Sequence, residues 1–386
     1  MAMIYGDDLA NDLSGTAGAD SIYGLGGDDT ITANAGDSVL GEVVDKCYGG
    51  LGDDVYNLYR TSAAGTYILN RASSVLEEID QGYDVVNLHT QGAITMYYMD
   101  VNIEELNAYG EIANIWGGSG DDVVTVSNRA TGVAIMGRNG DDVLYGSDYS
   151  DRLDGGSGVD GMVGGKGDDF YVVDKVNDIV IEYANQGWDE VQSLAGIYKI
   201  GNNVEGLYLD AQTVQKGTGN SLDNYIEASN DYTKFVNGGA GNDTIRLVGA
   251  ADDLVIGGVG DDTLQAGLGG DVYRTSGAFG RDEITDTGGG DAVEFDVNES
   301  TLWFSKNGND LNVSVIGTQN GVTIKNWYSD SSAKIEEFYA GTGKLLTAAK
   351  VDSLVSAMSG FAQPSSTTLP TNIQTALAPT LAAAWQ

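Results

Sequence analysis

The sequence is poor in the residues on which most enzyme centres depend. It has one cysteine, Cys47, and one histidine, His89, among 386 residues. A zinc site of the HExxH type needs two histidines, and neither a GxSxG elbow nor a Walker A loop occurs. One thiol also excludes an intramolecular disulfide. We therefore expect no enzyme, no catalytic residue and no organic cofactor, with His89 on a strand or at the surface and Cys47 buried as a small apolar residue.

Basic residues are also scarce. The chain has 19 Lys and Arg against 57 Asp and Glu, and its formal net charge is -38. Such a charge repels nucleic acid and anionic membrane surfaces, and it attracts cations. The N-terminal MAMIYGDDLAND has no basic segment followed by an apolar run, and no stretch is long enough to span a membrane. We therefore expect cations as partners, and neither nucleic acid binding, a transmembrane segment nor Sec-type export.

Glycine, by contrast, is abundant, with 56 residues. From Gly137 to Val172 four nine-residue units follow one another: GRNGDDVLY, GSDYSDRLD, GGSGVDGMV and GGKGDDFYV. They share glycine at position one, usually glycine at position four, aspartate at position six and an apolar residue at position eight. Glycine permits a tight turn, and the last three residues form a short strand with one inward side chain. Because such a strand is not stable alone, the units must stack into a solenoid.

Two units, or 18 residues, make one coil, so that units n and n+2 lie above each other at about 4.8 Å. Asp142 then stacks on Asp160, and Asp151 on Asp169. Carboxylates this close repel each other unless a cation lies between them. A site made of oxygen ligands, without thiol or imidazole, suits Ca²⁺, which accepts six to eight oxygens. The sequence therefore predicts several calcium ions that join successive coils.

The pattern G-G-x-G-x-D-x-U-x in these units resembles the RTX calcium-binding nonapeptide of hemolysin-type proteins. The expected fold is all-β: a calcium-binding parallel β-roll, closed by a small C-terminal β/α cap. The expected metal ligands are the position-six aspartates and the carbonyls of the position-four turns. They are Asp20, Asp29, Asp54, Asp122, Asp142, Asp151, Asp160, Asp169, Asp243, Asp253, Asp262 and Asp271, with Gly140, Gly158, Gly167, Gly241 and Gly260.

Further units lie on both sides of the central array. Residues 6–32 contain three, one unit starts at Gly49, another starts at Gly117, and five fill 219–274. Asn11 replaces an aspartate, so the site that it shares with Asp29 is expected to be weaker.

The same register predicts further pairs, and also a gap. Asp122 should pair with Asp142, Asp243 with Asp262, and Asp253 with Asp271. Thr233 stands where a ligand is expected, and we expect an empty or distorted site there.

A longer repeat of roughly a hundred residues is superposed on the nonapeptides. GGLGDDVYN leads to DQGYDVV, GGKGDDFYV leads to NQGWDEV, and AGLGGDVYR leads to GGGDAVEF. Asp189 and Asp291 each lie 25 residues into their copies, and Asp84 lies 35 residues into the first copy. Loss of Asp84 is expected to weaken calcium-dependent folding far less than joint loss of Asp151 and Asp169.

After Glu294 the repeats give way to a different pattern. TLWFSKNGNDLNVSV, GVTIKNWYS and AKIEEFYA predict short strands, and AAKVDSLVSAMSGF predicts a short amphipathic helix. The aromatic residues of this region predict a hydrophobic cap, which a solenoid needs at its end. A carbohydrate-binding platform is the alternative. These residues are Trp303, Phe304, Trp327, Tyr328 and Phe338.

Residues 353–386 have no charge and contain all three prolines. LVSAMSGFAQP followed by TLPTNIQTALAPTLAAAW resembles the C-terminal end of RTX proteins. This resemblance implies a signal for a type I secretion apparatus and an extracellular or bacterial cell-surface location. We expect four parts: an N-terminal β-roll with irregular coils (1–125), a central and C-terminal RTX β-roll (126–294), a capping domain (295–360) and the uncharged tail (361–386).

We expect a secreted protein that folds on extracellular Ca²⁺ and assembles into homo-oligomers or polymers. Its role would be structural, at the surface or in a biofilm matrix, as in an S-layer, filament or adhesin. Two alternatives stay open: the secretion-and-folding region of an RTX toxin, lipase or protease, and a polysaccharide-binding or polysaccharide-modifying module. The roll begins almost at Met1, which is expected to leave no room for a preceding domain and disfavours the first alternative. Either the protein is this short or an N-terminal portion has been removed.

Overall fold

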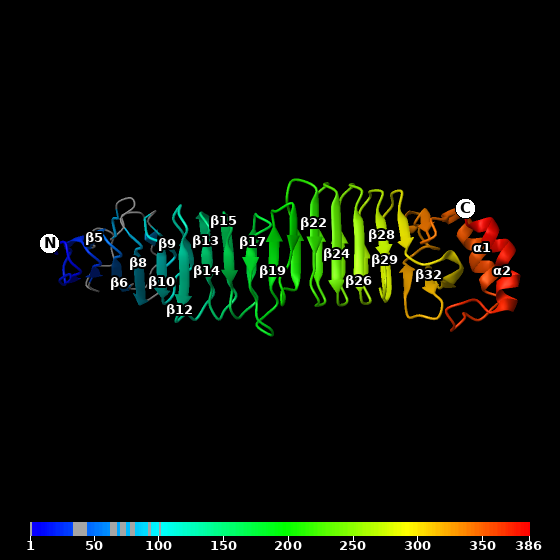
Figure 1. The fold of residues 1–386 in the computed structure, drawn as a ribbon, viewed down its shortest axis with the longest axis horizontal. Coiled ribbons are helices and arrows are strands. Elements are labelled where there is room, and N and C mark those ends of the chain that lie inside the picture. The colour runs from blue at the N-terminus through cyan, green and yellow to red at the C-terminus, as the bar shows by residue number, and fades with distance from the viewer. Residues whose placement is uncertain are drawn as a thin grey trace. The chain divides into compact units, whose positions relative to one another are not determined.

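The structure is a computed structural model that describes residues 2–33, 45–61, 68–69, 75–77, 82–91, 94–99 and 102–386. The chain forms two compact units, Met1–Gln192 and Ser193–Gln386. In both units short strands follow one another coil by coil (Figure 1). The predicted all-β fold and its parallel β-roll are confirmed. The four-part division expected from the sequence stays a prediction.

Unit one is built of parallel ladders, in which each strand pairs with the strand two elements further along the chain. The first ladder contains β1 (Met3–Tyr5), β3 (Ser21–Gly26) and β5 (Lys46–Leu51). The second contains β2 (Asp12–Ser14), β4 (Thr30–Ala33), β6 (Val55–Thr61), β8 (Val85–Gln91), β10 (Glu105–Tyr109), β12 (Val123–Ser127), β14 (Val143–Tyr145), β16 (Gly161–Val163) and β18 (Ile179–Val180). The third contains β7 (Ile68–Leu69), β9 (Met96–Tyr98), β11 (Asn114–Trp116), β13 (Ala134–Asn139), β15 (Arg152–Ser157) and β17 (Phe170–Val173), and β19 (Glu190–Ser193) contains the boundary between the units.

The central coils have the predicted length. Arg152 lies beside Ala134, and Gly161 lies beside Val143, so that one coil takes 18 residues. The inward side chains at position eight of the four units are fully buried at 0% exposure. They form one continuous core inside the coils, as a solenoid of three-residue strands requires. These side chains are Leu144, Leu153, Met162 and Tyr171.

Earlier coils are longer but keep like residues above one another. Lys46 lies beside Ser21, and Val85 lies beside Val55. Cys47 is buried at an inward position, as predicted. His89 lies on a strand, where its ring stacks between Tyr59 and Tyr109 with centroid distances of 4.7 and 4.6 Å.

Unit two repeats this arrangement and then changes to antiparallel pairing. One ladder contains β21 (Gly206–Leu209), β23 (Tyr225–Ala228), β25 (Thr244–Leu247), β27 (Thr263–Gln265) and β29 (Arg281–Thr285), followed by β33 (Gly321–Ile324), β32 (Asp310–Val315) and β31 (Leu302–Asn307). The other contains β20 (Ile197–Lys199), β22 (Gln215–Thr218), β24 (Lys234–Ala240), β26 (Leu254–Val259), β28 (Val272–Thr275), β30 (Ala292–Phe295), β34 (Glu337–Tyr339) and β35 (Leu345–Thr347). Two 3-10 turns, η1 (Glu299–Thr301) and η2 (Ser331–Ala333), precede the helices α1 (Ala348–Met358) and α2 (Thr371–Ala384).

The aromatic residues after the repeats form the core of this cap. Trp303, Phe304, Trp327 and Phe338 are all at least 97% buried. Phe304 and Phe338 meet edge to face at 5.9 Å. Because a sugar-binding platform needs exposed ring faces, the structure does not support the carbohydrate platform at these four rings. It favours the hydrophobic cap, in which the predicted helix α1 buries Val351, Leu354 and Met358.

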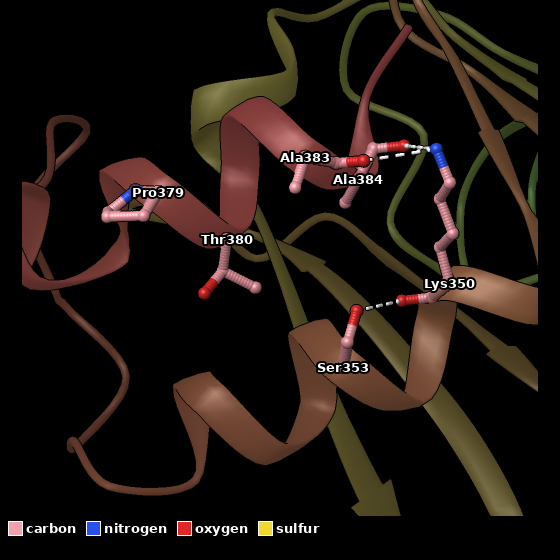
Figure 2. A pocket seen from close by; sticks show the side chains of 6 residues that line it. All are labelled: Lys350, Ser353, Pro379, Thr380, Ala383 and Ala384. Carbon is pink, nitrogen blue, oxygen red and sulfur yellow. Dashed lines mark hydrogen bonds between the residues drawn. The ribbon is translucent and has the colours of Figure 1, made fainter.

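The uncharged C-terminal residues contain a helix that the sequence pattern did not predict. Helix α2 packs on α1 and buries Ile373 and Leu377. The ammonium of Lys350 donates hydrogen bonds to the carbonyls of Ala383 and Ala384, at 3.0 and 3.4 Å, at the C-terminal end of α2 (Figure 2). A cation there is favoured by the helix dipole. The tail is therefore docked on the cap.

Candidate metal centre

The turns between strands place two glycines where no side chain fits. A Cβ at Gly137, position one of its unit, would lie 2.2 Å from Oδ2 of Asp142 and 2.5 Å from the carbonyl oxygen of Gly155 in the next coil. A Cβ at Gly158, position four, would lie 1.8 Å from the carbonyl oxygen of Gly140. The close approach lets carbonyl oxygens of successive coils line up beside the aspartates.

The five position-four glycines predicted as carbonyl ligands share this geometry. All have positive φ, and a Cβ at each would lie within 2.4 Å of backbone atoms in the preceding coil. They are Gly140, Gly158, Gly167, Gly241 and Gly260.

The position-six aspartates form what we call the inner column, in which each side chain reaches back to the preceding coil. Oδ1 of Asp160 accepts a hydrogen bond from the backbone N–H of Asp142 at 2.9 Å. Oδ1 of Asp169 accepts one from the N–H of Asp151 at 2.7 Å. The predicted stacking of these two pairs is therefore correct.

The other predicted stacks follow the same rule. The bonds join Asn11 to Asp29 at 2.7 Å, Asp122 to Asp142 at 2.8 Å, Asp243 to Asp262 at 2.8 Å and Asp253 to Asp271 at 2.8 Å. The structure also joins Asp29 to Asp54 at 2.7 Å. Each inner-column aspartate thus uses Oδ1 to hold the coil before it, and its second oxygen stays available.

That second oxygen has no hydrogen-bond donor in most members of the inner column. Oδ2 is buried and accepts no hydrogen bond from the described part of the chain in Asp29, Asp54, Asp142, Asp160, Asp169, Asp243, Asp262 and Asp271. A buried, unpaired carboxylate oxygen costs several kcal/mol unless a cation compensates it. The recurrence of this oxygen beside stacked carbonyls fits a hard divalent cation between coils.

Burial raises the pKa of the inner-column carboxyls in the absence of a cation. The pKa rises to about 7 for Asp142, to about 6 for Asp160 and to about 8 for Asp169, with loss of hydration as the largest cause. In unit two the pKa of Asp243 and that of Asp271 both rise to about 7 for the same reason. The fold therefore strains to keep these groups charged, and a bound cation would relieve the strain.

Some predicted ligands have a different environment. Oδ2 of Asp20 accepts hydrogen bonds from the N–H and hydroxyl of Thr16, both at 2.6 Å. Oδ2 of Asp122 accepts one from the N–H of Gly118 at 2.6 Å, and Oδ2 of Asp151 accepts one from the N–H of Ser147 at 2.5 Å. These three oxygens already have donors, so a cation would have to compete for them.

The structure adds members to the inner column that the nonapeptide pattern missed. All are buried aspartates directly before a strand: Asp45, Asp84, Asp178, Asp189, Asp282 and Asp291. Oδ1 of Asp84, for example, accepts a hydrogen bond from the N–H of Asp54 at 2.9 Å. Asp84 is therefore part of the column, and the expectation that its loss is mild has no structural basis. The useful signal was aspartate followed by alternating apolar residues, even without the glycines.

Position five forms an outer column with the opposite direction. Oδ1 of Asp141 accepts a hydrogen bond from the N–H of Val159 in the following coil at 2.8 Å, and Oδ1 of Asp121 accepts one from Asp141 at 2.7 Å. These side chains are exposed. Adjacent residues in one turn thus hold the coils before and after it, but only the inner one is removed from water.

Two coils carry a basic side chain beside the inner column. Lys234, not Thr233, occupies the aspartate's place, because its N–H bonds Oδ1 of Asp253 at 2.7 Å. Its buried ammonium donates to Oδ1 of Asn230 at 2.7 Å, to the carbonyl of Asn230 at 3.2 Å and to the carbonyl of Tyr232. The expected empty site is therefore filled by a side-chain cation.

Arg129 supplies the corresponding charge in unit one. Its guanidinium donates to the carbonyls of Gly110 and Thr131 at 3.1 Å, of Ile112 at 2.5 Å and of Gly132 at 2.9 Å. The next residue of this coil in column register, Val133, donates its N–H to Oδ1 of Asp151 at 2.7 Å. Turn carbonyls that have no aspartate in their own coil are thus satisfied by an arginine.

The fold and the columns define a class of protein, a parallel β-roll whose turns present oxygen ligands to hard cations. Comparison with known families agrees. The RTX calcium-binding nonapeptide repeat (4 copies) matches residues 5–40, 114–127, 136–171, 235–247 and 248–275. The Haemolysin-type calcium binding protein related domain matches residues 310–339.

Among curated proteins the chain is similar to the plasmid hemolysin of Escherichia coli, with 32% identity over 97 residues. The match covers 22% of this chain and 10% of that protein, so the chain spans about a tenth of its relative's length. These findings identify the chain as an RTX repeat protein of the hemolysin type, and its repeats imply that it binds Ca²⁺. Among the described residues, no helix is both long enough and apolar enough to cross a membrane.

Proposed function

We propose that Ca²⁺ ions bind between successive coils at the inner column. The ligands would be the twelve aspartates predicted from the sequence, the carbonyls of the position-four turns and the six further aspartates of the column. The observation that supports this most directly is the repeated buried Oδ2 that accepts no hydrogen bond from any described residue. The weakest sites would be the one with Asn11, which has one charge fewer, and those at Asp20, Asp122 and Asp151, where donors compete.

Calcium binding at these places would be part of the folding free energy, because the sites exist only in the coiled chain. Extracellular calcium is comparable to dissociation constants of roughly 10⁻⁴ to 10⁻³ M for extracellular modules. A tenfold excess over the dissociation constant gives about 1.4 kcal/mol per site. Six such sites give roughly 8 kcal/mol, which is comparable to the stability of a whole domain. The chain would stay expanded where calcium is scarce and fold after export.

Secretion through a type I apparatus fits this conditional fold. The uncharged tail is docked on the cap in the folded protein, where Leu345 and Gln386 exchange backbone hydrogen bonds at 3.0 and 2.9 Å. In the expanded chain those residues would be accessible to an exporter. The location that we propose is extracellular or at the bacterial cell surface.

The physiological role that we propose is structural, through calcium-dependent self-assembly. The first coil of this chain has open strand edges at β1 and β2, each paired on one side, and Met3, Tyr5 and Leu9 are 57–69% exposed there. An open parallel edge with apolar side chains favours addition of another strand. A second copy of the chain would cover it and extend the roll.

A second candidate is the secretion-and-folding region of a larger RTX protein. The observation that favours it is the match to a tenth of a hemolysin. In that case the open edge at β1 would be continued by further coils of the same polypeptide.

Sedimentation velocity of the purified chain, in chelator and then in millimolar calcium, tests the proposal. Self-assembly predicts compaction together with polymers that chelator dissolves. A compact monomer alone would favour the second candidate. An unchanged sedimentation coefficient would contradict calcium-dependent folding itself.

A further inference from the structure

Three nonapeptides end in a tyrosine at the inward position, where other units have an aliphatic residue. They are the first units of the hundred-residue repeats, and the tyrosines are Tyr56, Tyr171 and Tyr273. All three side chains are at least 99% buried. A buried phenol needs a polar partner, and in each copy an acidic residue from the irregular segment that follows comes close to it.

The second copy shows the arrangement most fully. Oη of Tyr171 accepts a hydrogen bond from the N–H of Gly164 at 2.7 Å and donates one to Oε1 of Glu182. Asp189, in the next coil, accepts a bond from the N–H of Asp169 at 2.9 Å. Asp169, Glu182 and Asp189 are all buried, and one carboxylate oxygen of each lies within 4.8 Å of the others.

The third copy, in unit two, repeats it with other residues. Oη of Tyr273 accepts a bond from the N–H of Ala266 at 3.1 Å and donates one to Oδ1 of Asp286 at 3.4 Å. Asp286 thus takes the place of Glu182. Asp271, Asp286 and Asp291 again have one carboxylate oxygen each within 4.8 Å of the others.

The first copy has the same residue types in a looser form. Oε1 of Glu77 accepts a bond from the N–H of Gly49 at 2.8 Å, and Asp84 accepts one from Asp54 at 2.9 Å. The hydroxyl of Tyr56 is buried and makes no hydrogen bond within the described chain. It lies with Oδ2 of Asp54 against Gly49, where a Cβ would be 2.3 and 1.8 Å from the two oxygens. This unpartnered phenol is an observation independent of the acidic residues.

Three converging carboxylates need a positive charge that the described chain does not supply. Lys234 is the only basic residue in the described buried set, and it belongs to another coil. Oδ2 of Asp169 and Oδ2 of Asp271 are buried, directed into their clusters, and accept no hydrogen bond from the described residues. Two oxygens bound to one Ca²⁺ at 2.3–2.6 Å are at most about 5 Å apart. The 4.8 Å limit of both clusters fits that sphere.

We propose that each hundred-residue repeat contains a second class of calcium site. Its ligands are the position-six aspartate, the aspartate of the next coil and an acidic residue of the irregular segment, which the tyrosine hydroxyl holds in place. With three carboxylates instead of two, it binds Ca²⁺ more tightly than an ordinary inner-column site. It also fixes the irregular segment to the roll. This site rests on the calcium binding proposed above but adds ligands that the nonapeptide does not contain.

The test uses Glu182→Gln in the full chain, with calcium counted by native mass spectrometry and stability measured in calcium and in chelator. The expected result is one calcium ion fewer per molecule and a smaller calcium-induced rise in melting temperature. In chelator the variant should be as stable as the parent or more stable, because one repelling charge is lost. Glu190→Gln, a half-buried residue on the neighbouring strand β19, is the matched control and should change neither quantity.

A second variant guards against misfolding of the first. Asp286→Asn should remove one ion independently, and the double variant should remove two. An unchanged calcium count in both single variants would overturn the proposal. So would an equal loss of stability in calcium and in chelator, which would show a metal-free hydrogen-bonded cluster. Failure of the parent chain to bind calcium would instead contradict the proposed function.

Discussion

Two kinds of coil in this protein solve the same electrostatic problem differently. Around Asp142 and Asp160 the turns present acidic oxygens and carbonyls, and Oδ2 of both aspartates meets no donor within the described residues. Around Lys234 and Arg129 the chain's own cation donates hydrogen bonds to the turn carbonyls. A stacked turn of this roll therefore needs a positive charge, which either the solvent or the sequence can supply. Only the first kind of coil should depend on calcium.

The largest effect that separates the two kinds is expected for joint substitution of Asp142→Asn and Asp160→Asn. Three inter-coil contacts change: Asp122 with Asp142, Asp142 with Asp160, and Asp160 with Asp178. At tenfold calcium excess the loss is about 4 kcal/mol of unfolding free energy. Urea denaturation with and without chelator measures it. Equal losses in both conditions would show that these residues do not bind the ion.

The next largest effect is expected at Lys234. Lys234→Met leaves the carbonyls of Asn230 and Tyr232 without their donor, which costs about 1–3 kcal/mol. The loss should be the same in calcium and in chelator, because no ion is involved. Lys234→Asp should lower stability in chelator and regain part of it in calcium, since it restores an acidic pair with Asp253. A calcium-dependent loss in Lys234→Met would contradict the idea of a side-chain cation.

The pH dependence should have opposite signs with and without calcium. The inner-column carboxyls have pKa values of about 6 to 8 in the metal-free fold, as for Asp142, Asp160 and Asp169. Their unfolded value is about 4. The folded chain therefore binds more protons than the unfolded chain, and metal-free stability falls as the pH rises from about 4 to 8. Calcium competes with those protons, so calcium affinity rises over the same range.

Circular dichroism in chelator and in calcium, at pH 5 and pH 8, measures this reversal. Secondary structure in chelator should be greater at pH 5, and the calcium midpoint should be lower at pH 8. A metal-free chain that loses structure on acidification would contradict the assigned pKa direction.

The smallest effect is expected at Asp141, the sequence neighbour of Asp142. Asp141 is exposed, and asparagine keeps the oxygen that accepts the N–H of Val159. Asp141→Asn should change stability by about 0.5 kcal/mol or less in either condition. It is the matched control for Asp142→Asn. A loss as large as that of Asp142→Asn would show that the inner and outer columns share one role.

The regular part of the roll could be predicted from the sequence because a fixed period determines which residues stack. Spacing of 18 residues was enough to pair Asp142 with Asp160 and to place Leu144 and Met162 in the core. Coils of other lengths broke that rule, so the period alone gave Asp84 no place in the column. Each such coil still returns an aspartate to the same register.

Other features depend on contacts that no period encodes. Glu182 approaches Tyr171 through an irregular segment, and only comparison of the hundred-residue repeats could have suggested it. Helix α2 has no charged face to reveal it, and it forms because Ile373 and Leu377 find an apolar surface on the cap. Lys234 was misplaced by one residue, since a ten-residue unit shifts the nonapeptide frame.

Hydrogen–deuterium exchange of the full chain, in calcium and in chelator, tests the central claim most directly. The amides of β14 and β16, between the aspartate turns, should lose protection by about tenfold or more without calcium, in proportion to at least one lost site. The amides of β24, which begins at Lys234, should lose clearly less. Equal protection of β14 and β16 in both conditions, or a greater loss at β24, would contradict the account.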